Sequence, residues 1–86
     1  METVYVLTVI WQRDSGECGD TVAVFQNIDS AQAKMEQEMK DARTDFSDLD
    51  TEETEYSDGD MGWSIWETGE YCYNHCDITI REMEVQ

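Results

Sequence analysis

Three side chains that could hold a metal ion stand close together near the end of the sequence. Cys72, His75 and Cys76 form a C-x2-H-C pattern, and Cys18 supplies a fourth ligand for a tetrahedral zinc site. Structural zinc sites usually present two close ligand pairs, whereas Cys18 has no close partner and the adjacent His75 and Cys76 make chelation awkward. We therefore expect reduced cysteines and no cofactor, with a small metal-stabilised regulator as the alternative.

The same side chains could form a nucleophile and its base. A reactive thiolate needs a neighbouring base or a positive field. Here 21 Asp and Glu against five Lys and Arg leave a net charge of −16, and a negative field raises a thiol pKa and weakens the nucleophile. The sequence therefore predicts a protein that is not an enzyme and has no catalytic residues.

An acidic run in the middle of the chain could bind calcium. Residues 45–60 hold eight acids and neither Lys nor Arg. In the register that starts at Asp48, Glu53 stands where an EF-hand loop needs glycine, and Gly59 stands where it needs a bidentate glutamate. The run is too charged to build a core by itself, so we expect a solvated acidic loop at about 47–60.

The net charge also limits the partners. A charge of −16 repels nucleic acid and anionic membranes and favours cationic partners. The longest apolar stretch, from Val4 to Trp11, is far shorter than the roughly 20 residues of a membrane helix. The start of the chain lacks the basic and apolar regions of a secretory signal. We therefore expect a cytoplasmic protein that contacts neither nucleic acid nor membrane directly.

The first half of the chain predicts two strands and a helix. Residues 3–11 and 21–26 are rich in β-branched and aromatic side chains and indicate a hairpin, whose first strand is apolar on both faces and therefore central. Asp29 can cap a helix, with Gln32 closing a capping box. The helix should lie on the sheet through apolar residues at three- and four-residue steps: Ile28, Ala31, Met35, Met39, Ala42 and Phe46.

The second half predicts two more strands. Residues 61–67 and 77–85 show strand patterning, with Trp63 and Trp66 on opposite faces. Beyond Ile80 the apolar residues change parity, which predicts a β-bulge or an early end of the strand. A chain of 86 residues is one domain. The predicted fold is a single α+β domain in the order β-β-α-β-β, with one helix packed on an antiparallel sheet of about four strands.

One helix covers only one face of such a sheet, so the other face needs a cover. The acidic loop or the Tyr71 to Tyr73 segment could fold over it, or a homodimer or partner interface could use aromatic anchors there. The candidate interface aromatics are Tyr5, Trp11, Trp63 and Trp66.

Both ends of the chain carry a recognisable pattern. The C-terminal third reads Gly69-x-Tyr71-x-x-Asn74-His75-x-x-Ile78-x-Ile80-x-Glu82, and the start reads Val4-Tyr5-Val6-Leu7-Thr8. Over these residues, about half of its length, the chain resembles small acidic uncharacterised proteins of gut bacteria of the Bacteroides kind. Such proteins are often carried with mobile elements. The resemblance implies no activity. It implies a bacterial accessory protein linked to conjugative transfer or to host defence.

Charge and composition together predict a non-enzymatic acidic protein that binds or inhibits a basic, nucleic-acid-handling protein. Mimicry of DNA is one form of this function, although the loop alone carries one carboxylate per roughly 6.6 Å, against 3.4 Å along one strand of B-DNA. The alternatives are a metal-stabilised regulator and a structural subunit of a homo-oligomer. The predicted partner contacts are Asp48, Asp50, Glu52, Glu53, Glu55, Asp58 and Asp60.

Overall fold

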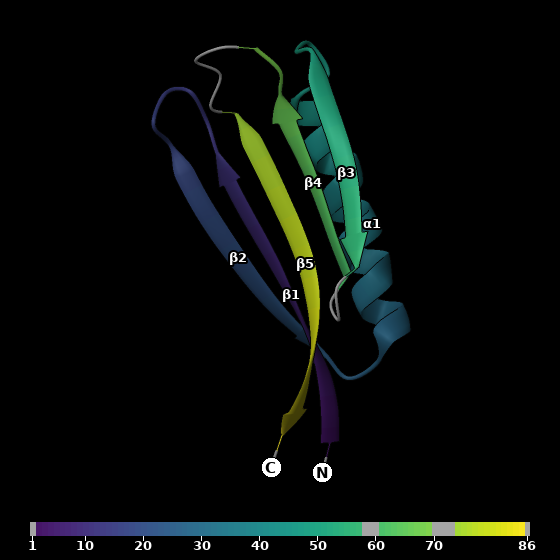
Figure 1. Ribbon diagram of the computed structural model, residues 1–86. Helices are drawn as coiled ribbons and strands as arrows, with labels where there is room; N and C mark the ends of the chain where they lie inside the picture. Colours follow the sequence, from purple (N-terminus) through teal and green to yellow (C-terminus); the bar gives the residue numbers. More distant parts are fainter. Residues whose placement is uncertain (1, 58–60, 70–73, 86) are drawn as a thin grey trace.

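The protein folds into a five-stranded antiparallel sheet with one helix against it (Figure 1). The computed structural model describes residues 2–57, 61–69 and 74–85, with residues 56 and 57 described by their backbone alone. The elements are β1 (Glu2–Gln12), β2 (Cys18–Phe25), α1 (Ile28–Asp45), β3 (Thr51–Ser57), β4 (Met61–Glu67) and β5 (His75–Val85). The strand order across the sheet is β2-β1-β5-β4-β3. The predicted α+β class is confirmed, with five strands in place of four.

Strand β1 is central because it pairs with β2 on one side and with β5 on the other, as its apolar faces predict. The hairpin between β1 and β2 turns through Gly16, whose φ of 92° suits a residue without a Cβ. Gly19 on β2 lies opposite Trp11, and a Cβ there would stand 2.7 Å from the indole ring. A glycine is needed at that position because the ring of Trp11 lies over it.

The predicted acidic loop at 47–60 is wrong for residues 51–57. A turn follows α1, and residues 51–57 then form β3, whose register with β4 runs from Thr51 opposite Glu67 to Ser57 opposite Met61. The high acid content of this segment does not prevent a strand, because glutamate is only weakly disfavoured in strands. At the edge of a sheet, the acidic side chains also stay in contact with water. Asp58 and Asp60 lie outside the described residues.

The N-cap of the helix lies two residues earlier than predicted. Asn27 is the N-cap, and its side-chain oxygen accepts a hydrogen bond from the Ser30 amide at 2.8 Å. Asp29 lies in the first turn, where a negative charge stabilises the helix dipole. The helix ends where the Phe46 amide donates to the Ala42 carbonyl at 3.0 Å. The apolar stripe predicted for this helix does face the sheet, with Ala31, Met35, Ala42 and Phe46 buried.

The helix divides the sheet into two unlike faces. On the covered face lie the buried side chains Leu7, Val9, Trp63, Ile65, Cys76, Ile78 and Ile80. On the open face, away from the helix, the same strands and β2 present Thr8, Ile10, Val22, Val24, Ser64, Trp66, Asp77 and Thr79. The core therefore lies entirely between α1 and one face of β1, β4 and β5.

Neither the predicted bulge nor the predicted early end of the strand beyond Ile80 occurs in β5. The register with β1 continues without interruption to Val85, opposite Glu2, whereas pairing with β4 ends at Ile80. Met83 consequently lies on the open face and is exposed. Figure 1 shows the start of β1 and the end of β5 projecting together beyond the helix. Within the described residues, α1 is too polar to be a membrane-spanning helix.

Candidate functional site

A groove opens between α1 and the β3–β4 hairpin. Its volume is about 470 Å³, and it is lined by Gln32, Met35, Glu36, Met39, Glu55, Met61 and Gly62. We call this the methionine groove. The helical residues recur at three- and four-residue steps, so they share the side of α1 that faces the hairpin. Met61 and Gly62 of β4 line the facing wall.

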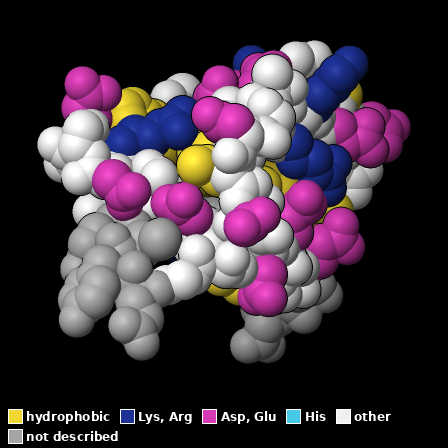
Figure 2. Space-filling model, turned by 90° about the horizontal axis from the view of Figure 1, so that it is seen from above, with side chains coloured by type: hydrophobic (Ala, Val, Ile, Leu, Met, Phe, Trp, Pro, Cys, Tyr) yellow, Lys and Arg dark blue, Asp and Glu magenta, His cyan; other side chains and the backbone are white. Residues whose placement is uncertain are grey.

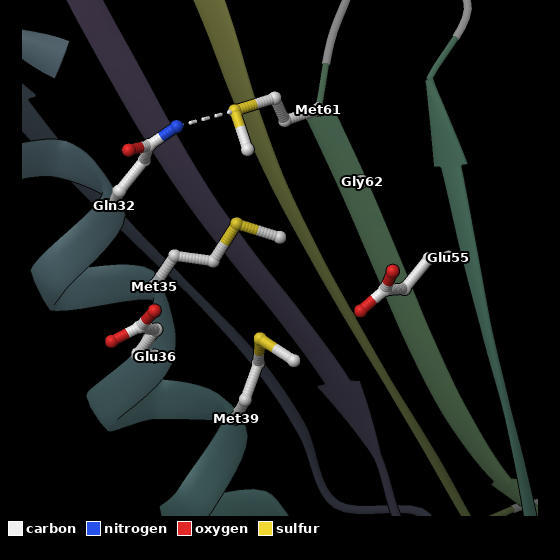
Figure 3. A pocket seen from close by; sticks show the side chains of 7 residues that line it. All are labelled: Gln32, Met35, Glu36, Met39, Glu55, Met61 and Gly62. Atoms are coloured by element: carbon white, nitrogen blue, oxygen red, sulfur yellow. Dashed lines mark hydrogen bonds between the residues drawn. The ribbon is translucent and has the colours of Figure 1, made fainter.

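Three thioethers line the methionine groove, two from α1 and one from β4. Figure 3 shows Met35 and Met39 reaching from α1 toward the strands, and Met61 reaching back from β4 toward the helix. Met35 is buried, Met39 is half-buried, and Met61 is 37% exposed. The Gln32 amide donates to the Met61 sulfur at 3.3 Å and joins the two walls. Methionine side chains are flexible and polarisable, so such a surface adapts to apolar groups of different shapes.

Two exposed carboxylates flank these methionines. Glu36 belongs to α1 and Glu55 to β3, so they stand on opposite walls of the groove (Figure 3). An apolar channel with an acid on each side can accept an apolar group whose neighbours carry positive charge.

One turn beyond Met39, a charged cluster ties the two walls together. The Arg43 guanidinium donates to Oε1 of Glu53 from Nη2 at 2.6 Å and from Nε at 2.9 Å, and Trp63 Nε1 donates to the same oxygen at 3.0 Å. The guanidinium carbon also lies 5.3 Å from the centre of the Trp63 ring. The hydrogen bond from Arg43 holds the pKa of Glu53 below its ordinary value, and the same bond raises the pKa of Arg43. Glu53 is therefore engaged within the fold.

The predicted partner-binding acids that the structure describes do not share one face of β3, because strand alternation separates Glu52 from Glu53 and Glu55. Asp48 lies exposed in the turn after α1, and the Asp50 carbonyl in the same turn accepts a hydrogen bond from the Thr68 amide at 2.9 Å. Glu52 is exposed on the open face, while Glu55 stands at the methionine groove. Figure 2, a view from above, shows acidic side chains spread over this end of the molecule with basic ones among them.

The four candidate interface aromatics have different places. Trp63 is 1% exposed and belongs to the core, so its assignment as an interface anchor is wrong. Tyr5 and Trp11 are partly buried and pack against the same core. Trp66 alone of the four lies on the open face, since alternation along β4 turns it away from Trp63.

The candidate metal ligands do not converge on one face. His75 and Cys76 are neighbours on β5, so their side chains point to opposite faces of the sheet and cannot share one ion. Cys18 is exposed on β2, and Cys72 lies outside the described residues. Across residues 2–57, 61–69 and 74–85, no three His, Cys, Asp or Glu side chains are grouped to hold a metal ion. Burial raises the pKa of the Cys76 thiol to about 11, with the Asp77 carboxylate as the next cause.

A polar network lies on the open face in a shallow hollow beside Trp66. The Ser64 hydroxyl donates to Oδ1 of Asp77, while His75 Nδ1 lies 3.5 Å from the other oxygen. His75 Nε2 is 3.2 Å from the Gln12 side-chain oxygen. The Asp77 carboxylate, and not the imidazole, accepts the hydrogen bond of the serine hydroxyl, so this arrangement is not a serine–histidine nucleophile pair.

No protein-family model matches the chain, and neither a curated protein nor a solved structure does. The fold and site define a small α+β protein with a methionine groove, an open sheet face and a strongly acidic surface. The sequence patterns located Met35 and Met39 on the inner side of the helix, but nothing in them linked these residues to Met61.

Proposed function

We propose that the protein is a non-enzymatic, cytoplasmic binding module that captures or inhibits a basic protein of the nucleic-acid-handling kind. The observation that carries this proposal is the excess of exposed carboxylates. The ion pairs of Lys and Arg within the described residues include those to Asp45, Glu38 and Glu53. The exposed acids Asp48, Asp50, Glu52 and Glu55 belong to none of these pairs. They can contact Lys and Arg of a partner and speed its capture.

The shape of the molecule supports mimicry of DNA as the form of this binding. The chain is elongated, with principal extents of 46 × 21 × 20 Å. Duplex DNA of that length carries about 27 charges, at one per 1.7 Å of axis. A net charge of −16 is of the same order, although it is more dilute. The resemblance to accessory proteins of mobile elements fits such a role and stays a prediction.

The test compares two variants that lose the same number of charges. The first, D48N/D50N/E52Q/E55Q, neutralises predicted contacts and spares Glu53, because Glu53 holds Arg43 and Trp63. The matched control, E2Q/D20N/E82Q/E84Q, neutralises exposed acids on β2 and on the projecting ends of β1 and β5. Each protein is immobilised and exposed to host lysate at low and high salt, and a retained protein is identified by mass spectrometry and titrated in purified form.

We expect a basic partner whose affinity falls with salt, falls about 10-fold in the first variant, and falls less in the control. An equal loss of affinity in both variants would show that the net charge drives binding without a defined surface. An affinity that changes neither with salt nor in either variant would overturn the proposal.

A second candidate function is that of a structural subunit in a homo-oligomer. The observation in its favour is that Ile10, Val22, Val24 and Met83 are exposed together on the open face. Sedimentation equilibrium at low and high salt tests it, because salt screens the repulsion between copies that each carry −16. A dimer that strengthens with salt and is lost in V22T/V24T supports this function, whereas a monomer at every salt concentration removes it.

A further inference from the structure

The methionine groove combines features that the excess of charge alone does not explain. An exposed acidic surface needs no apolar channel, yet here Met39 and Met61 leave partly exposed thioethers between two carboxylates. The volume of about 470 Å³ falls in the range of roughly 300–1,000 Å³ typical of sites that enclose small apolar ligands. It is large enough to receive apolar side chains of a docking segment.

The charges around the groove select the kind of segment. Glu36 and Glu55 stand on opposite walls, and Arg43 beyond Met39 is neutralised by Glu53. A second copy of this chain would bring a net charge of −16 against these carboxylates, which disfavours it as the occupant. A segment with Lys or Arg beside an apolar stripe would satisfy both the carboxylates and the thioethers.

We infer that the methionine groove binds a cationic amphipathic helix of the basic partner. Apolar side chains spaced along one face of that helix enter between Met35, Met39 and Met61, and flanking Lys or Arg side chains meet Glu36 and Glu55. This is the helix-in-groove form of recognition, with methionine supplying an adaptable surface. The inference rests on the proposed function, since it names the part of the basic partner that is bound.

The test uses a synthetic helical peptide of leucine and lysine as the probe. Two control peptides keep its length: one replaces every leucine with glutamine and keeps the charge, and the other replaces every lysine with glutamate. Binding is measured by fluorescence anisotropy, and its place is read from the NMR signals of methionine methyl groups labelled with carbon-13. Met83 is the internal control, because it is exposed on the open face, away from the groove.

We expect the leucine–lysine peptide to shift the methyl signals of Met35, Met39 and Met61 and to leave that of Met83 in place. The variant M39Q/M61Q should bind this peptide about 10-fold more weakly, because it removes apolar contacts of roughly one side chain. The variant M83Q should bind it as wild type does. The glutamine–lysine peptide should bind weakly and equally to all three proteins, and the leucine–glutamate peptide should not bind.

The contrary outcomes separate this inference from the proposed function. Equal binding of the leucine–lysine and glutamine–lysine peptides, with no methyl shift, would overturn binding at the groove and leave charge-based capture intact. A shift at Met83 alone would move the apolar contact to the open face and overturn the groove as well. Shifts of the groove methyls that grow with protein concentration, without peptide, would make a second copy the occupant. Absence of binding by either cationic peptide at low salt would count against both proposals.

Discussion

The covered face and the open face of the sheet are built from the same strands but have different chemistry. On the covered face, side chains such as Leu7, Ile65 and Ile78 are at most 1% exposed and pack against α1. On the open face, Val24 is 62% exposed, and Asp77 joins Ser64 and His75 in a polar network. The difference arises because one helix supplies one layer, and an apolar side chain contributes fully to stability only where a second layer excludes water.

This comparison separates stability from binding. The covered face holds the fold together, and Glu53 on that side of β3 is engaged with Arg43 of α1. The open face and the rim of the methionine groove contribute less to folding and remain accessible to a partner. Residues that are neighbours in sequence but lie on opposite faces should therefore respond differently to the same substitution.

The largest expected difference is between the two tryptophans of β4. The substitution Trp63→Ala should lower the free energy of unfolding by about 3–5 kcal/mol, because it leaves a cavity in the core. Trp66→Ala on the open face should cost less than about 2 kcal/mol. Urea unfolding followed by circular dichroism measures both.

Since Trp63→Ala removes a large part of a typical domain stability of about 5–15 kcal/mol, Trp63→Phe serves as a milder second variant. It keeps a ring in the core but loses the hydrogen bond to Glu53, and it should still be less stable than wild type. Equal destabilisation by Trp63→Ala and Trp66→Ala would mean that the open face is covered in solution.

The next difference is between two cysteines. Cys76 is buried on the covered face with its pKa raised to about 11, whereas Cys18 is exposed on β2. At pH 8 the thiolate fraction of Cys76 is on the order of one in a thousand, so it should react with iodoacetamide at least about 100-fold more slowly than Cys18. Mass spectrometry of timed samples, in a Cys72→Ser background, measures both rates.

Addition of denaturant should bring the two rates together, because unfolding exposes Cys76. Comparable rates in the native protein would show that the helix does not protect this part of the core.

The smallest difference is between two neighbouring glutamates of β3. Glu53→Gln should destabilise the protein by about 1 kcal/mol at neutral pH, since it weakens hydrogen bonds from Arg43 and Trp63, and partial exposure of the ion pair limits the effect. Glu52→Gln on the open face is the matched control and should change stability by less than about 0.5 kcal/mol.

The pH dependence sharpens this comparison. The pKa of Glu53 is lowered from its ordinary value of 4.5, so its contribution to stability is present above about pH 4.5 and is lost as the pH falls through the folded-state value. The gap between wild type and Glu53→Gln should therefore close in acid, as measured by urea unfolding over a pH series. A gap that persists at low pH would show that the carboxylate charge is not its cause.

Periodicity in the sequence is sufficient to predict β1, the inner side of α1 and the placement of Trp63 and Trp66 on opposite faces of β4. These features depend on residues close together in the chain, where side-chain direction follows from local geometry. The helix cap was misplaced by two residues, because Asn27 and Asp29 are both good capping residues and only the observed hydrogen bond distinguishes them. The acidic loop was a larger error, since the pairing of β3 with β4 overrides the weak strand preference of glutamate.

The sequence by itself determined that this protein is a small, strongly acidic α+β domain, because composition and local periodicity require no knowledge of distant contacts. The tertiary structure decided which acids are engaged and which are available. Glu53 meets Arg43 and Trp63 ten residues away, and Met61 meets a helix 29 residues earlier in the chain. Such contacts arise from strand register and from the packing of α1 on the sheet, and both are fixed only when the whole chain folds.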